Sequence, residues 1–205
     1  MAFIQNAAFE VKISNHEFDS IANITGTYMN ASDAAEVVSS GFLCVRDALT
    51  PNEGYENVGP VGATITLENT NTWTMKAAAA TDTAQKGIFA VNPFDVNMVQ
   101  DPATGNMYKV GANTLGLAVP AGYRTTFTRI YFNNNNVYRF GIGNLSAALG
   151  ENTFFTIANG LLVPAAAAPS DAGVPYFELI RSGTFTEGAY AAFDYVDVRA
   201  CLSEA

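Results

Sequence analysis

Charge and chemically reactive residues are both scarce in this sequence. Charged residues make up 14% of the 205 residues, well below the roughly 25% that is usual for soluble domains. The chain has one histidine, His16, and two cysteines, Cys44 and Cys201, that lie far apart. A Ser–His or Cys–His nucleophilic site would need His16 as its base, and no GxSxG motif accompanies it. We therefore expect no catalytic residues and a protein that is not an enzyme.

The residues that bind metals and cofactors are missing as well. Zinc sites usually take three or four Cys and His ligands in close pairs, which one histidine and two distant cysteines cannot supply. The loop 101–106 offers oxygens that suit calcium, but the EF-hand pattern is absent and turn formation accounts for the same residues. GIGNLS, at 141–146, lacks both the GxGxxG continuation and the P-loop lysine. The sequence predicts no metal, no cofactor and no small-molecule ligand.

Clustered basic residues are absent too. The net charge is −9 and the 10 basic residues are scattered, whereas neutralising phosphates requires clustered Lys and Arg, so no nucleic-acid partner is expected. No run of about eighteen apolar residues occurs, and the N-terminus has no signal-peptide pattern, so no membrane partner is expected either. Two cysteines form no disulfide framework, and we expect both thiols to be buried and reduced, as in a protein that folds in the cytoplasm.

Alternating strands and turn residues dominate what is present. In the stretch 115–143, period-two runs at 125–132 and 137–142 flank Asn133, Asn134, Asn135 and Asn136. Asparagine tolerates positive φ and bonds its own backbone, so this pattern predicts a long antiparallel hairpin with a four-residue loop.

Further strands are predicted between turn signals along the rest of the chain. Asn159-Gly160 is typical of a type I′ hairpin turn, and 101–106 predicts a second hairpin. Asp33–Val38 suits a short helix with Ser32 as its N-cap. The predicted strands lie at 9–13, 41–45, 63–67, 88–91, 94–99, 107–110, 154–157, 161–163, 176–181 and 191–198. Their regular spacing predicts an all-β fold, an antiparallel sandwich or barrel of many short strands with an N-terminal arm.

The N-terminal segment, residues 1–35, differs in texture from the β-rich domain, or pair of small subdomains, expected at 36–205. Its strand at 9–13 either adds to the sheet edge of a neighbouring protein or completes the protein's own sheet. In the first case the partner-binding residues would be Phe3, Ile4, Phe9, Val11, Ile13 and Phe18, together with the asparagine loop 133–136. In the second case, the attachment surface would lie in the loops 133–136 and 165–175.

An alternative hypothesis is a carbohydrate-binding or glycan-cleaving β module. A glycosidase needs two carboxylates that face each other across a cleft, and Glu178, Asp194 and Asp197 are the acids on predicted strands. A sugar-stacking platform could use the aromatic residues Trp73, Tyr123, Tyr131, Tyr138 and Tyr176. Core or interface packing is the more usual role of such residues.

Over roughly residues 41–200 the chain resembles structural proteins of tailed-bacteriophage virions, in particular capsid decoration (cement) proteins. The resemblance rests on GYENVGPVGATITLEN at 54–69, GLAVPAG at 116–122, NTFFTIANGLLVPAAAAP at 152–169 and the segment 176–200. It implies a non-enzymatic protein that is made in the host cytoplasm and binds the outside of the capsid. The implied partners are the major capsid protein and copies of the protein itself, as a trimer at local symmetry axes. Tail and head-fibre proteins share the same texture.

Overall fold

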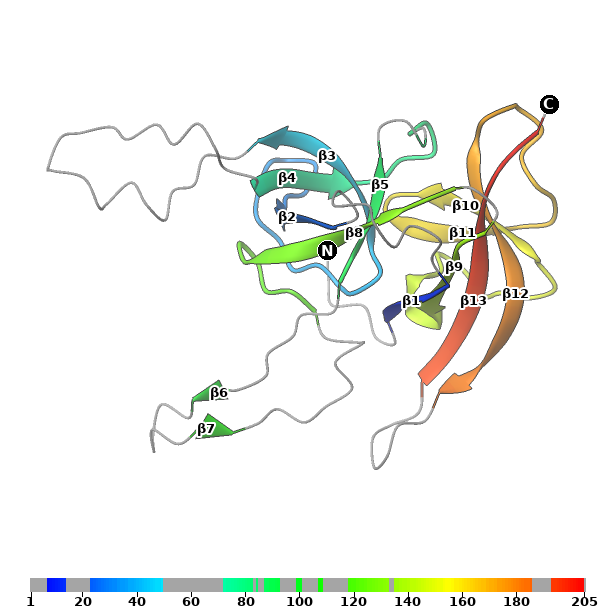
Figure 1. Ribbon diagram of the computed structural model, residues 1–205. Helices are drawn as coiled ribbons and strands as arrows, with labels where there is room; N and C mark the ends of the chain where they lie inside the picture. The colour runs from blue at the N-terminus through cyan, green and yellow to red at the C-terminus, as the bar shows by residue number, and fades with distance from the viewer. Residues whose placement is uncertain are drawn as a thin grey trace, which may run out of the picture.

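Nearly every regular element of the protein is a β-strand, as Figure 1 shows for its computed structural model. This confirms the all-β fold that the sequence predicts. The structure describes residues 7–13, 23–49, 72–82, 84, 87–92, 99–100, 107–108, 118–132, 135–185 and 193–204. Within these residues, no helix is long and apolar enough to cross a membrane. The predicted strand at 63–67 lies outside them, and so does the strand predicted at 94–99 except for Val99.

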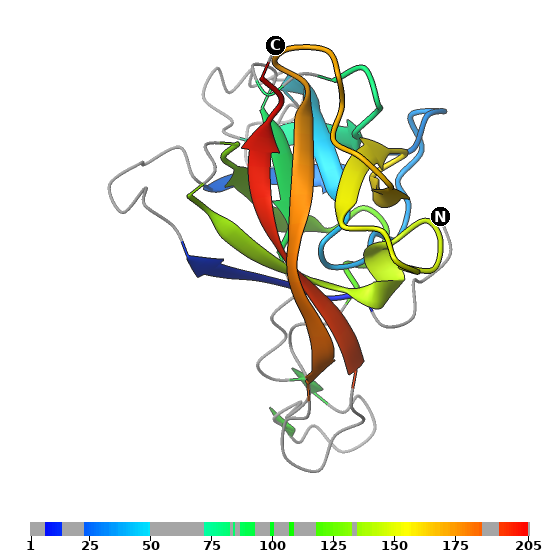
Figure 2. The ribbon, with the colours of Figure 1, turned by 90° about the vertical axis from the view of Figure 1, so that its right-hand side faces the viewer.

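Six antiparallel strands form the larger sheet. Their spatial order is β1 (Phe9–Ile13), β9 (Val137–Gly141), β13 (Phe193–Leu202), β12 (Pro175–Phe185), β10 (Phe154–Ala158) and β11 (Leu161–Ala165). The long pair β12 and β13 extends from Pro175↔Leu202 to Phe185↔Phe193, and its register shifts once, between Leu179 and Arg181. This ribbon projects beyond the other strands of the sheet (Figure 2).

A closed five-stranded barrel packs beside this sheet. Its order is β2 (Asn23–Tyr28), β4 (Thr72–Ala77), β3 (Leu43–Leu49), β5 (Ile88–Val91) and β8 (Arg124–Ile130). The pair β2 and β4 is parallel and the other pairs are antiparallel. The short strands β6 (Val99–Gln100) and β7 (Met107–Tyr108) pair antiparallel with each other, while the turn predicted at 101–106 lies outside the described residues.

The sheet and the barrel share one hydrophobic core. Phe140 and Phe177 of the sheet pack edge to face with ring centroids 5.8 Å apart, and they belong to the same buried cluster as Leu43 and Ile88 of the barrel. A second cluster fills the barrel, with Phe42, Cys44, Met75, Phe89 and Phe127 at its centre. Burial of apolar side chains from both units in one cluster holds them together.

The hairpin predicted across the asparagine run is wrong, although both of its strands exist. Strand β8 lies in the barrel between β2 and β5, whereas β9 lies in the sheet between β1 and β13. The connection therefore crosses from one unit to the other. Asn136 is buried and its Nδ2 donates a hydrogen bond to the carbonyl of Tyr131, while the Tyr131 N–H donates to the Tyr138 hydroxyl. These bonds satisfy buried polar groups at the crossing, which a solvated hairpin loop would leave to water.

The strand at 9–13 completes the protein's own sheet, the second of the two alternatives left open by the sequence. Phe9 stands opposite Phe140 on β9, and it is buried against Phe140 and Tyr138 with ring centroids 5.3 and 6.1 Å away. The backbone just before it is also held, because Asn144 Oδ1 accepts a hydrogen bond from Ala8 N at 3.0 Å. Strand β2 belongs to the barrel, so the segment 1–35 contributes a strand to each unit.

The helix predicted at Asp33–Val38 is also wrong. The side chain of Asn30 accepts hydrogen bonds from the backbone N–H groups of Ser32 and Ala34, which makes a turn in place of an N-cap. Asp33 then takes a positive φ of 58°, which no helix allows. The hydrogen bonds from these backbone N–H groups to the Asn30 side chain take the place of the bonds that a helix would make.

The hairpin of β10 and β11 confirms the prediction made from Asn159-Gly160. Both residues have positive φ, 51° and 76°, as a type I′ turn requires. The turn also docks on the barrel, because Gly160 N donates to Ala78 O and Leu43 N donates to Gly160 O, each at 2.8 Å. A Cβ on Gly160 would lie 2.1 Å from Phe42 Cζ. The absence of a side chain thus lets the turn lie directly on the Phe42 ring.

We predict that Gly160→Ala destabilises the protein far more than Gly173→Ala. Both glycines have φ near 75°, so both changes carry the strain of a left-handed alanine, about 1 kcal/mol. Only Gly160→Ala also forces Phe42 to move, since nothing lies within 4 Å of a Cβ on Gly173. This overpacking should bring the total decrease in the free energy of unfolding of Gly160→Ala to about 3 kcal/mol. Urea unfolding of the two variants measures the difference, and equal losses would contradict the contact.

Candidate functional site

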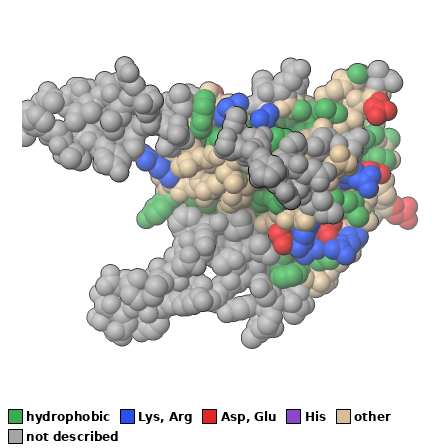
Figure 3. Space-filling view, viewed as in Figure 1, with side chains coloured by type: hydrophobic (Ala, Val, Ile, Leu, Met, Phe, Trp, Pro, Cys, Tyr) green, Lys and Arg blue, Asp and Glu red, His purple; other side chains and the backbone are tan. Residues whose placement is uncertain are grey.

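The face of the six-stranded sheet turned away from the core carries a row of charges. Along β13, Val196 and Val198 face the core, so Tyr195, Asp197 and Arg199 face the opposite side. Strand register places Arg139 of β9 and Arg181 of β12 on either side of Asp197. We call this side the outer face. Figure 3 shows one group of acidic and basic side chains that lie side by side on the surface.

Asp197 is the centre of this row. Its Oδ1 accepts a hydrogen bond from Arg139 Nε at 2.7 Å, and its Oδ2 accepts one from Arg181 Nε at 2.7 Å. The side chains of Asp197 and Arg139 are only 3% and 5% exposed, whereas that of Arg181 is 62% exposed. The Arg139 guanidinium also lies 3.7 Å from the centroid of the Tyr195 ring, a cation–π contact that covers it from solvent.

These contacts keep both buried groups charged. Burial by itself would raise the pKa of Asp197, but hydrogen bonds from Arg139 and Arg181 outweigh it and lower the pKa below the ordinary value. The hydrogen bond to Asp197 in turn raises the pKa of Arg139. A carboxylate held in this way stays ionised and saturated with donors. Its chemistry is that of a structural ion pair.

The three acids considered for glycan cleavage do not form a facing pair. Asp194 and Asp197 lie on opposite faces of β13, because they are three residues apart in a strand. Glu178 lies on the outer face, 3.5 Å from Arg199 NH1. Asp197 is held by its two arginines. No two of these carboxylates therefore face each other across a cleft, which is the geometry that glycoside hydrolysis needs.

The aromatic residues considered for sugar stacking are also dispersed. Tyr138 is buried in the core, and Trp73 on β4 lies under the guanidinium of Arg46 at 5.0 Å. Tyr176 packs against Phe154 on the sheet, while Tyr123, just before β8, is 58% exposed. These side chains point from different elements and form no shared platform.

Both cysteines are free and buried, as the sequence predicts. Burial raises the pKa of the Cys44 thiol well above its ordinary value, and burial also raises that of Cys201. A nucleophilic cysteine needs a lowered pKa. No group of three or more His, Cys, Asp and Glu side chains that could hold a metal is found within the described residues, among which His16 is not included.

The predicted partner-binding residues fall into four groups. Phe9 and Asn136 are buried within the protein itself, so they do not face a partner. Val11 is 39% exposed and Asn135 is exposed. The backbone of Ile13 pairs with Val137. The residues outside the described part of the chain are Phe3, Ile4, Phe18, Asn133 and Asn134.

The two edges of the six-stranded sheet are built against pairing with another strand. Edge strand β1 carries a 2.5 Å ion pair between Lys12 and Glu10, and its register shifts between Val11 and Ile13. The other edge strand, β11, contains Pro164, which cannot donate a ladder hydrogen bond. Charges, bulges and proline are the usual protections of an exposed edge. The edge of β1 is therefore a poor attachment site, and the loops are better candidates.

The loop 166–174, between β11 and β12, is the candidate that the structure favours. We call it the Ala-rich loop. Most of its residues are exposed, Ala166, Ala167 and Ala168 among them. The C-terminal end of the loop is held by Ser203. The Ser203 hydroxyl donates a hydrogen bond to the carbonyl oxygen of Asp171 and accepts one from the N–H of Val174 at 2.9 Å. The Ser203 backbone adds two further bonds, from Gly173 N at 2.9 Å and to Val174 O at 3.0 Å.

The Ala-rich loop is therefore a mostly exposed, mainly apolar segment whose C-terminal part is anchored to Ser203. Its composition indicates a loop, but no feature of the sequence shows that Ser203 anchors it. Comparison of the chain with known protein families, curated proteins and solved structures gave no match. Any role of the loop has to be argued from its own geometry.

We predict that Asp197→Asn lowers the free energy of unfolding by about 3 kcal/mol at neutral pH, because buried Arg139 loses its hydrogen-bonded carboxylate and keeps only the more distant Glu10, at 3.7 Å. Glu178→Gln is the matched control. It removes a carboxylate from the exposed pair with Arg199 on the same face, and it should cost less than about 1 kcal/mol. Chemical denaturation of both variants provides the measurement.

Asp197→Asn should also change how the stability of the protein depends on pH. The lowered pKa of Asp197 means that its contribution is complete above the unfolded-state pKa of about 4. That contribution is lost as the pH falls through the lower folded-state pKa. Thermal melts below about pH 4 should therefore show a shallower acid loss for Asp197→Asn than for the natural protein. If the melting temperatures of the two proteins fall equally with decreasing pH, the Asp197 ion pair does not contribute to stability.

Proposed function

We propose that the protein is a non-enzymatic structural component of a phage virion that binds the outside of the capsid and stabilises the shell. The observation that carries the proposal is the Ala-rich loop, which is mostly exposed and whose C-terminal part, from Asp171 to Val174, is anchored by four hydrogen bonds with Ser203. Of the three loop residues that these bonds hold, Asp171 and Gly173 are exposed and Val174 is half-buried. An ordered apolar loop is suited to contact with another protein.

The composition of the loop keeps the entropy cost of that contact low. Alanine and proline lose almost no side-chain entropy on burial, and a backbone that is already ordered loses little more. Each contact could still be weak. A decoration protein compensates by attaching through several copies at once, so that the second contact becomes intramolecular. Assembly as a trimer on the major capsid protein, which the sequence resemblance implies, would supply those copies.

We predict that virions purified from cells that produce this protein contain it in a fixed ratio to the major capsid protein. Quantitative mass spectrometry of the particles measures the ratio, and gold-labelled antibody on intact particles shows where the protein lies. Label over the capsid is expected. Its absence from purified particles would contradict a virion role, and label restricted to the tail would assign it to a fibre or tail component.

A second prediction concerns the loop. Ser203→Ala removes both side-chain hydrogen bonds to the loop, so ordering must occur at binding, and capsid affinity should fall at least about tenfold. Ser146→Ala, at an exposed serine elsewhere, is the control and should bind normally. Sedimentation with capsids that lack the protein measures binding, and hydrogen exchange of residues 170–174 confirms that the loop has loosened. Normal binding by a loosened loop would exclude the loop as the attachment surface.

A further inference from the structure

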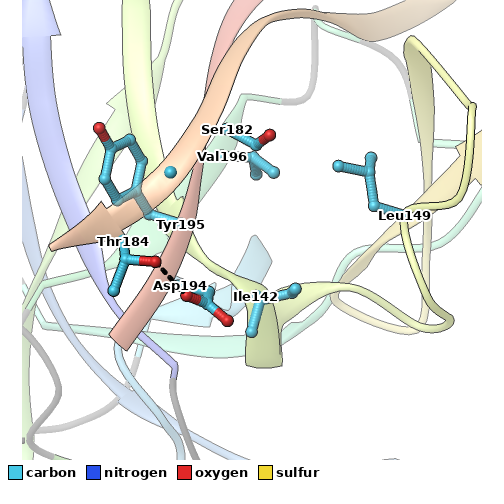
Figure 4. Close-up of a pocket in the computed structure, with 8 residues that line it drawn as sticks. Ile142, Leu149, Ser182, Thr184, Asp194, Tyr195 and Val196 are labelled. Carbon is cyan, nitrogen blue, oxygen red and sulfur yellow. Dashed lines mark hydrogen bonds between the residues drawn. The ribbon is translucent and has the colours of Figure 1, made fainter. Parts of the chain in front are cut away.

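A pocket of about 240 Å³ lies where the β12–β13 ribbon leaves the body of the protein. One wall is the ribbon, with Ser182, Thr184 and Asp194, and the other is apolar, with Ile142 of η4 (Ile142–Asn144) and Leu149. Figure 4 shows these side chains around the opening, while the ring of Tyr195 points away from it. That ring is stacked on Arg139 on the outer face.

The polar wall continues the core-facing row of the two strands. Val198 and Val196 face the core on β13, and Asp194 follows on the same face two residues further along. On β12, Ser182 and Thr184 stand opposite Val196 and Asp194. The row therefore changes from apolar to polar at the pocket. Within the described lining, Asp194 is the one charged side chain, so the pocket is negative.

The geometry of Asp194 selects the kind of cation. Thr184 Oγ1 donates a 2.7 Å hydrogen bond to Asp194 Oδ1, which leaves Oδ2 as the better acceptor for a ligand. A guanidinium binds best to both oxygens of a carboxylate, whereas an ammonium is a compact charge with three donors. Oδ2 and the Thr184 oxygen, which that hydrogen bond holds beside each other, are two acceptors for such a group. The aliphatic walls suit the methylene stem behind it.

We propose that this pocket binds the side chain of a lysine carried by a partner protein. A protein-borne lysine is favoured over a free amine because Ser182, Thr184 and Asp194 are all exposed, so a small amine would bury little surface there. A lysine on a partner would bring the surrounding contact with it. The inference concerns a different surface from the Ala-rich loop and does not depend on the proposed function.

The test is an NMR titration of the full-length protein with the peptide acetyl-Gly-Lys-Gly-amide. Saturable shifts are expected at Leu149, Ser182 and Thr184. The same peptide with norleucine, which keeps the stem and lacks the charge, should not produce them. Shifts that are absent with the lysine peptide, or equal with norleucine, would overturn the proposal. Binding of n-butylamine as tight as that of the peptide would assign the pocket to a free amine and would also overturn it.

Two variants separate the pocket from general charge attraction. Asp194→Asn keeps an oxygen to accept the Thr184 bond but removes the charge, and it should weaken peptide binding about tenfold, the usual effect of losing one charge-assisted hydrogen bond. Glu178→Gln removes the same amount of charge from the outer face of the same ribbon and should bind normally. Equal weakening in both variants would mean that the peptide responds to net charge, which contradicts a defined site.

Discussion

Packing of the six-stranded sheet on the barrel is the interaction on which the rest of the structure depends. Phe140 and Phe177 reach from the sheet into a cluster that includes Leu43 and Ile88 of the barrel. One steric contact and one set of hydrogen bonds fix the position of one unit on the other. Gly160 lies directly on the Phe42 ring, and buried Asn144 bonds both Ala8 N and Ser40 O. Hydrophobic burial supplies the attraction, whereas these contacts permit only one arrangement.

The sequence predicts the strands of this fold better than it predicts their partners. Period-two alternation marks β8, β9, β12 and β13, because it reports only that one face of a segment is buried. It does not report which segment lies alongside. The asparagine run therefore indicates a hairpin where the chain in fact crosses between two units. The Asn159-Gly160 turn is predicted correctly because two positive φ values are a local requirement of those two residues.

The candidate sites show the same limit. Alternation along β13 correctly separates Tyr195 and Asp197 from Asp194, Val196 and Val198. It cannot show that Asp197 is buried, since that depends on Arg139, which is 58 residues away in sequence. The Ala-rich loop is recognisable from composition, but its order depends on a serine hydroxyl 29 and 32 residues from its partners. Long-range polar contacts of this kind leave no periodic signal in the sequence.

A surface with so few charges must avoid indiscriminate association, and the structure restricts where contact can occur. The outer face is occupied by paired charges around Asp197. Both edges of the sheet are protected, β1 by Lys12, Glu10 and a bulge, and β11 by Pro164. Of the surfaces described, the Ala-rich loop and the small negative pocket are the two that we propose for contact with another protein. Protection of the sheet edges against general β-sheet association favours specific contact at those two surfaces.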